Sequence, residues 1–156
     1  MTRRYAYSLG GSRAVDSAPL SKPKNTTILS SIQLDGTLRY TTFSGGTTVE
    51  RFKRYLETDL LPHLNGNSVL IMDNMKSHHA KAVKNLLDSS GIRYIYLPPY
   101  SPDLNPIEKL WSKVKAFLRK FKARTLDALP NAIQNAFHAV TVSDCSGWFR
   151  FCGYAL

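Results

Sequence analysis

Apolar positions along the chain switch between the spacing of strands and the spacing of helices, and this pattern predicts an α/β fold. Runs rich in β-branched and aromatic residues predict strands, and the Asp35-Gly36 pair between the first two predicts a hairpin turn. Apolar residues three and four apart predict helices with one buried face. The predicted strands are 26–34, 37–43, 67–74 and 93–97, and the predicted helices are 49–61, 80–90, 106–121, 125–140 and a last short helix opened by Ser143.

The stretch from Tyr94 to Arg119 is the most specific part of the chain. A short strand ends at two prolines, which lack the N–H donor that a sheet needs, and a proline-rich turn leads into the helix. Asn105 suits the N-cap and Pro106 the first helical position, which places Glu108 on the first turn. A carboxylate there is a candidate catalytic group. The alternative is a capping box between Asn105 and Glu108, which stabilises a helix and does no chemistry.

A second carboxylate, Asp73, ends the apolar strand 67–74. Ligands of open α/β sheets bind beyond the carboxyl ends of the strands, so this is a position where a metal ligand is expected. The 34 residues between Asp73 and Glu108 hold one helix and one strand, and such a βαβ unit brings the two acids to one edge. The alternative is a turn or cap residue that opens the next helix.

The charge balance points to a polyanion as partner. Lys and Arg number 21 against 11 Asp and Glu, which gives a net charge of +10, and nucleic acid is the usual partner of so basic a domain. Seven basic residues and no acid lie between Lys109 and Arg124. The alternatives are a solvated helix face and, for the basic loop of residues 1–24, a frayed terminus. The DNA-binding candidates are Arg3, Arg4, Lys113, Lys115, Arg119 and Lys120.

Composition and cysteine usage limit the class of protein. A chain of 156 residues with 43% hydrophobic residues is long enough for one folded domain with a core. It has no signal peptide and no apolar run near 18 residues, so we expect a cytoplasmic protein. Cys145 and Cys152 have neither a metal-site spacing nor a disulfide framework and are expected to be buried thiols.

Two strings of residues resemble a known family. Leu70-Ile71-Met72-Asp73-Asn74 with His78, followed by Leu97-Pro98-Pro99-Tyr100-Ser101-Pro102-Asp103-Leu104-Asn105-Pro106-Ile107-Glu108, is similar to the catalytic half of bacterial insertion-sequence transposases of the mariner-related group. These proteins belong to the DDE superfamily. The resemblance implies an RNase H-like α/β fold with a mixed β-sheet flanked by helices. It covers nearly the whole chain, and we expect a basic arm at 1–24 and the catalytic domain at 25–156.

The resemblance also implies a reaction and its ligands. Family members cleave DNA at the ends of a mobile element and join it to a target, using two Mg²⁺ or Mn²⁺ ions held by carboxylates. On this chain Asp73 and Glu108 match the metal ligands, and Asn74, His78 and Asn105 are their expected neighbours. His78 matches a histidine that would orient water or phosphate or contact Asp73; the alternative is a structural hydrogen bond.

One acid of the family pattern has no match in this sequence. Family members carry a first aspartate on a central strand shortly before the segment that here begins at Met1, so this chain offers two of three acids. We therefore expect a partner that supplies the first aspartate, either an upstream polypeptide or a second protomer in a homodimer on DNA. Two alternatives stay open from the sequence: a non-catalytic, DNA-binding remnant of a transposase, and an interaction domain whose acids only cap helices and turns.

Overall fold

The computed structural model describes residues 7–15, 25–121 and 127–154. The chain divides into two compact units, one of residues 1–23 and 110–140 and the other of residues 24–109 and 141–156, and each is described by itself. Within the predicted basic arm 1–24, residues 7–15 are described, with a 3-10 turn at Leu9–Gly11. Of the described helices, none combines the length and the apolar composition that crossing a bilayer requires.

The predicted hairpin is confirmed. β1 (Thr26–Ile32) pairs antiparallel with β2 (Leu38–Ser44), and the last residue of β1 faces the first of β2. Gly36 has a φ of 88°, a conformation that glycine adopts without strain. Asp35 accepts a hydrogen bond from the backbone N–H of Thr37 at 2.8 Å, as Asp does in tight turns. Asp35 is therefore a turn residue.

A helix predicted over 49–61 is present and changes its winding. α1 (Val49–Tyr55) is capped by the Thr48 side chain and continues as a π-helical segment (η2, Leu56–Leu60) and a 3-10 turn (η3, Leu61–His63). Its apolar stripe is buried, as the spacing predicted. The buried side chains are Phe52, Tyr55, Leu56 and Leu60.

A parallel βαβ unit follows, also as predicted. β3 (Val69–Met72) and β4 (Arg93–Tyr96) pair in parallel. The helix α2 (Lys81–Ser90) connects them in the sequence, and it ends at Gly91, which has a φ of 69°. β3 is shorter than the predicted strand 67–74. Because a parallel pair brings the carboxyl ends of both strands to one edge, the residues after Met72 and Tyr96 share that edge.

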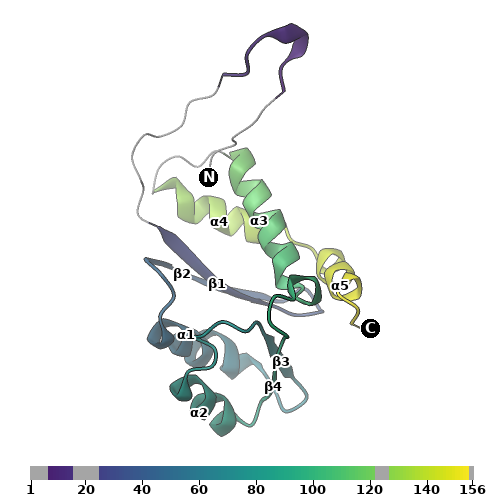
Figure 1. Cartoon of the computed structure of the whole chain (residues 1–156). Helices are drawn as coiled ribbons and strands as arrows, with labels where there is room; N and C mark the ends of the chain where they lie inside the picture. The colour runs from purple at the N-terminus through teal and green to yellow at the C-terminus, as the bar shows by residue number, and fades with distance from the viewer. Residues whose placement is uncertain (1–6, 16–24, 122–126, 155–156) are drawn as a thin grey trace. The chain divides into compact units, whose positions relative to one another are not determined.

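One apolar core joins these elements. Side chains from α1, its π-helical continuation, β3 and α2 are buried together, and Leu29 of β1 and Tyr94 and Tyr96 of β4 pack against them. Figure 1 shows α1 and α2 next to each other. The described strands form two separate two-stranded sheets, one antiparallel and one parallel. Both strand directions of the predicted mixed sheet are thus present, although no ladder bonds link the two pairs.

Helix α3 (Ile107–Phe121) follows a 3-10 turn (η4, Pro102–Leu104). Its first turn belongs to the second unit and the rest to the first, where α4 (Ala128–His138) also lies. The rings of Trp111 and Phe137 meet edge to face with centroids 6.4 Å apart. The predicted start of α4 at residue 125 lies outside the described residues. The buried side chains of these two helices are Leu110, Val114, Ala132, Ile133, Ala136 and Phe137.

The last helix, α5 (Val142–Phe151), begins earlier than predicted. Thr141 is its N-cap: its hydroxyl accepts a hydrogen bond from the backbone N–H of Asp144, and the Asp144 carboxylate accepts one from the backbone N–H of Thr141. The prediction that Ser143 opens this helix is therefore wrong. Cys145 and Cys152 are buried thiols outside any disulfide, which confirms the prediction for both.

Candidate active site

The candidate site begins at the edge where β3 and β4 end. The ladder continues one residue past β4, because the backbone N–H of Leu97 donates to the carbonyl of Met72 at 2.8 Å. Asp73 is the next residue, and its side chain is 43% exposed. The parallel register therefore fixes the backbone of Asp73 beside the start of the proline-rich loop and leaves its carboxylate open to solvent.

The carboxylate of Asp73 is held through one of its two oxygens. Oδ1 accepts hydrogen bonds from Nδ1 of His78 at 2.8 Å and from the backbone N–H of Met75 at 3.1 Å. Oδ2 makes no hydrogen bond within the described residues. The His78 contact is the main cause that lowers the pKa of Asp73 below its ordinary value, and partial burial opposes it. Asp73 is thus held as a carboxylate, with one oxygen oriented and one available.

His78 is itself fixed by its surroundings. Its ring lies against the ring of Phe52 with centroids 4.2 Å apart, and its side chain is only 12% exposed. The Tyr96 hydroxyl donates to the carbonyl of His78 at 2.9 Å. The structure therefore brings His78 to Asp73, one of the contacts expected from the sequence. Its part in orienting a water or a phosphate stays a prediction.

Asn74 contacts a residue to which the sequence assigned no role. Its side-chain oxygen contacts Nε2 of His79, and the His79 ring stacks on Tyr96 at a centroid distance of 4.0 Å. Within the described residues, Asn74 makes no hydrogen bond to Asp73. The pair Tyr96 and His79 escaped sequence analysis, because a strand residue and a loop residue 17 positions earlier carry no shared motif. The predicted role of Asn74 beside a metal ligand stays untested.

Glu108 lies on the first turn of α3. Its backbone N–H donates to the carbonyl of Asn105 at 3.1 Å, and Asn105 has the extended backbone of an N-cap. Within the described residues, however, neither the Asn105 side chain nor the Glu108 carboxylate makes a hydrogen bond, and Glu108 is exposed. The capping box that the sequence left open is therefore not formed. The carboxylate of Glu108 is available for a ligand.

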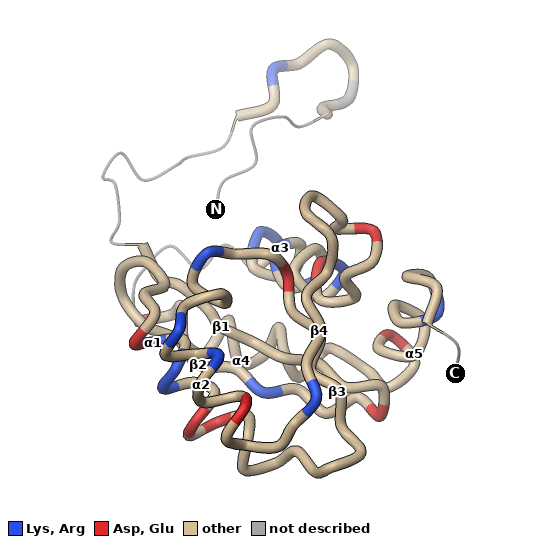
Figure 2. Tube along the Cα trace, turned by 60° about the horizontal axis from the view of Figure 1, so that its bottom comes forward, with Lys and Arg blue, Asp and Glu red and all other residues tan. Residues whose placement is uncertain are grey.

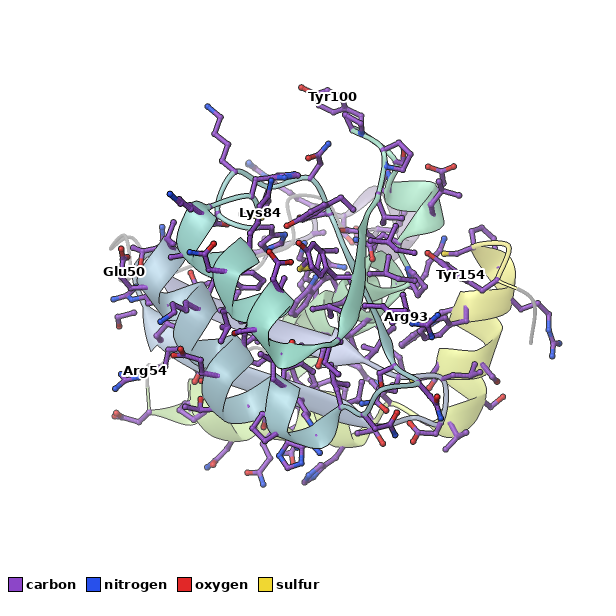
Figure 3. All side chains as sticks on the ribbon, turned by 90° about the horizontal axis from the view of Figure 1, so that it is seen from below. Glu50, Arg54, Lys84, Arg93, Tyr100 and Tyr154 are labelled. Atoms are coloured by element: carbon purple, nitrogen blue, oxygen red, sulfur yellow. The ribbon has the colours of Figure 1, made fainter. Side chains whose placement is uncertain are left out.

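The C-terminal segment holds the loop that leads to Glu108. The Tyr154 hydroxyl donates to the carbonyl of Leu104 at 2.9 Å, and Nζ of Lys109 lies 3.8 Å from the centre of the Phe151 ring. Tyr154 is labelled in Figure 3 beside α5. Sequence analysis missed both contacts, since the two residues of each pair are more than 40 positions apart. They fix the position from which α3 starts.

The predicted DNA-binding residues of α3 differ in exposure. Lys115 and Lys120 are exposed, whereas Lys113 and Arg119 are half-buried. Figure 2 shows the Lys and Arg positions in blue, several of them along α3. Lys113 has an interaction of its own, and Lys109 is engaged with Phe151, so part of this basic series is structural. Arg3 and Arg4 lie outside the described residues.

Comparison with known families shows to which family the chain belongs. Residues 1–130 match the family model described as "DDE superfamily endonuclease". The chain belongs to this family. The Tc1 transposase of the transposable element Tc1 from Caenorhabditis elegans is 29% identical over 97 residues, which are 60% of this chain and 36% of that protein. The chain therefore spans about a third of the length of this relative.

Solved structures support the same assignment for the fold. The chain resembles the crystal structure of the Mos1 mariner paired end complex with Mn, with a TM-score of 0.78 and 21% identity over 96% of this chain and 47% of that chain. It also resembles the catalytic domain of Mos1 mariner transposase, with a TM-score of 0.72 and 19% identity over 83% of this chain and 70% of that one. The predicted RNase H-like α/β fold and the predicted membership of the DDE superfamily are confirmed.

Several finer predictions from the sequence stay predictions. They are its bacterial insertion-sequence origin, the absence of the first aspartate, and the domain boundary between 1–24 and 25–156. The metal ligands are also untested. Across residues 7–15, 25–121 and 127–154, no three His, Cys, Asp or Glu side chains gather closely enough to hold a metal ion.

Proposed function

We propose that this chain is the catalytic part of a DNA transposase, which cleaves DNA at the ends of a mobile element and joins it to a target. The observation that carries the proposal is the state of the two acids on the family motif. Asp73 keeps one carboxylate oxygen without a partner in the described structure, and the Glu108 carboxylate has no hydrogen bond there at all. Acids with unused oxygens suit ligand binding better than a structural role.

These oxygens fit a hard divalent cation. Mg²⁺ prefers oxygen ligands and is commonly held by one or two carboxylates together with waters and substrate phosphate. In this proposal Asp73 and Glu108 would hold Mg²⁺ or Mn²⁺. Two bound ions would supply Lewis-acid activation of the attacking and leaving oxygens at a phosphodiester. The third carboxylate comes from an upstream polypeptide or from a second protomer in a homodimer on DNA.

The remaining residues position the acids and the substrate. His78 keeps Oδ1 of Asp73 oriented and leaves Oδ2 for a ligand, as residues behind metal ligands commonly do. Tyr154 and Phe151 fix the start of α3 and with it Glu108. Asn105 lies next to Glu108 as part of the same site. Lys115, Lys120 and Arg119, with Arg3 and Arg4, neutralise phosphates along the DNA. We place this activity in the bacterial cytoplasm, at the nucleoid.

Metal binding is tested first, without DNA. We expect Mn²⁺ to raise the melting temperature of the 156-residue chain, because a ligand that binds only the folded state stabilises it. Asp73→Ala removes this rise, whereas Glu57→Gln, a change to an exposed carboxylate paired with Lys53, leaves it intact. Equal responses of wild type and Asp73→Ala would contradict a metal site at Asp73.

Cleavage is tested on supercoiled plasmid and on a labelled duplex, with Mg²⁺ or Mn²⁺. We expect metal-dependent strand cleavage that Glu108→Gln abolishes, once the polypeptide carrying the third acid is present. The intact mass of the product in its own host decides which partner to add. A mass well above the 17.5 kDa of this chain would indicate a joined upstream segment. DNA binding without cleavage in either metal would instead favour the non-catalytic remnant.

A further inference from the structure

Tyr100 adopts a backbone conformation that its side chain makes unfavourable. It has a φ of +57°, and it is the only residue other than glycine with a positive φ in the described part of the chain. Bulky residues with a Cβ rarely occupy this left-handed region, whereas Gly and Asn do so readily. Strained positions of this kind persist where surrounding structure imposes them, and they cluster at functional sites.

The loop around Tyr100 imposes the strain. Pro98, Pro99 and Pro102 restrict the backbone on both sides, because proline fixes its own φ and limits the residue before it. The backbone N–H of Leu104 donates to the carbonyl of Ser101 at 3.2 Å and closes the following 3-10 turn. Tyr100 is thus presented by a rigid loop.

Packing within the chain does not explain a tyrosine at this position. The residue is 102% exposed, and its hydroxyl makes no hydrogen bond within the described residues. Figure 3 shows its side chain projecting from the loop, away from the body of the unit. A glycine would form the same turn without strain. Packing within the described residues therefore gives no reason for an aromatic ring at this position.

The position of the loop indicates what kind of ligand the Tyr100 ring would meet. The loop starts at the sheet edge where Asp73 follows Met72, and it ends at the helix that carries Glu108. Lys76 follows Asp73 by three residues and Lys81 begins α2. Both are exposed, and neither makes an ion pair within the described residues. Exposed cations together with an exposed aromatic ring are the combination by which proteins bind unpaired nucleic acid strands.

We propose that Tyr100 stacks on a nucleobase of the DNA strand next to the phosphodiester on which Asp73 and Glu108 act. Lys76 and Lys81 contact the flanking phosphates. The ring takes any base, because every base offers a π-face, so Tyr100 binds distorted or unpaired DNA without reading sequence. This inference rests on the proposed DNA-binding function, and its test separates the two.

The test measures binding of a labelled 16-nucleotide single strand by fluorescence anisotropy, without metal, to the full chain. We expect Tyr100→Phe and Tyr100→Trp to bind within about twofold of wild type and Tyr100→Ala to bind about tenfold more weakly. Tyr100→Gly melts at a higher temperature than wild type and shows the same loss of binding. Ile95→Ala, a change to another exposed apolar side chain, leaves binding unchanged.

Salt dependence and base fluorescence separate stacking from charge. Tyr100→Ala keeps the slope of log K against log[salt], whereas Lys76→Ala reduces it by about 0.7. A 2-aminopurine in the strand is quenched by wild type and less by Tyr100→Ala. Wild-type affinity and quenching in Tyr100→Ala would overturn the stacking role while DNA binding stands. No binding by wild type would refute the proposed function itself, and loss of self-association alone in Tyr100→Ala would reassign the ring to a protein contact.

Discussion

The starts of α3 and α5 have similar sequences and different structures. Each has a capping residue followed three positions later by an acid, Asn105 with Glu108 and Thr141 with Asp144. At α5 the two residues exchange hydrogen bonds and form a capping box. At α3, within the described residues, the acid makes none. The difference shows that the same local pattern serves stability at one helix and leaves a carboxylate free at the other.

Backbone geometry before each helix accounts for this difference. The backbone N–H of Asn105, to which Glu108 would reach back in a capping box, already donates to the carbonyl of Pro102 at 3.2 Å in the 3-10 turn. The corresponding N–H of Thr141 has Asp144 as its partner at 2.8 Å. In the proline-rich turn, the backbone N–H that a capping Glu108 would accept from is therefore already bonded to another carbonyl.

The largest expected effect comes from removing the carboxylate of Glu108. Glu108→Gln should reduce metal-dependent DNA cleavage by at least about a thousandfold, because metal stabilisation of the developing charge contributes several kcal/mol. The free energy of unfolding should change by less than about 1 kcal/mol, the scale of a charge on the first turn of a helix. Cleavage assays and urea unfolding of the same preparation check both. A variant that unfolds easily and still cleaves would reverse the roles assigned to Glu108 and Asp144.

The converse change breaks the capping box. Thr141→Ala should lower the free energy of unfolding by about 1–2 kcal/mol. The change removes the hydroxyl that accepts a hydrogen bond from the backbone N–H of Asp144, and with it one half of the capping box. Metal binding should be unchanged below the melting temperature. Urea unfolding measures the loss, and Thr141→Ser, which keeps the hydroxyl, is the matched control. Full stability in Thr141→Ala would mean that the box contributes nothing.

The two helix starts are linked through the C-terminal segment, and Tyr154→Phe weakens that link. It removes one hydrogen bond to the Leu104 carbonyl, which we expect to lower the free energy of unfolding by about 0.5–1 kcal/mol. We also expect weaker Mn²⁺ binding at Glu108, measured by the Mn²⁺ electron paramagnetic resonance signal. Tyr94→Phe is the control variant, because it also removes one tyrosine hydrogen bond, the one to Asp88 at 2.8 Å. Unchanged Mn²⁺ affinity would limit Tyr154 to a structural role.

The smallest effect concerns Asp73, the acid that does have a partner. Its pKa lies below the ordinary value of 3.8, mainly through the hydrogen bond from His78. Its contribution to stability is therefore fully present above about pH 4 and is lost as pH falls through the lowered pKa. His78→Ala should raise the pKa of Asp73 toward 3.8, as measured by carboxyl ¹³C NMR. His63→Ala should leave it unchanged, and an unshifted Asp73 in His78→Ala would contradict the assigned cause.

Much of the local structure was predictable because it depends on short-range rules. The Asp35-Gly36 hairpin, the helix after Thr48 and the βαβ unit around α2 follow from turn residues and apolar spacing. The predicted start of the last helix at Ser143 is wrong, because Thr141 caps this helix and Asp144, three residues later, completes the capping box. The candidate acids Asp73 and Glu108 were found because each lies at the end of a predicted element.

The partners of these acids were not predictable in the same way. Nothing in the apolar pattern places Phe52 on His78 or Tyr154 on Leu104, since both contacts join distant parts of the chain. The strained φ of Tyr100 was also invisible, because its sequence context suggests only a turn. Such features depend on how packed elements constrain a loop.

The sequence by itself determined the elements, their order, the basic character of the chain and the two acids on a family motif, because propensity, periodicity and charge are properties of short segments. Only the tertiary structure decided which acids are occupied. It engages Asp144 in a cap, holds Asp73 through His78 on one oxygen and leaves Glu108 without a hydrogen bond among the described residues. The physical reason is that a hydrogen-bond donor can be satisfied by any neighbour that folding brings near, and sequence spacing does not specify that neighbour.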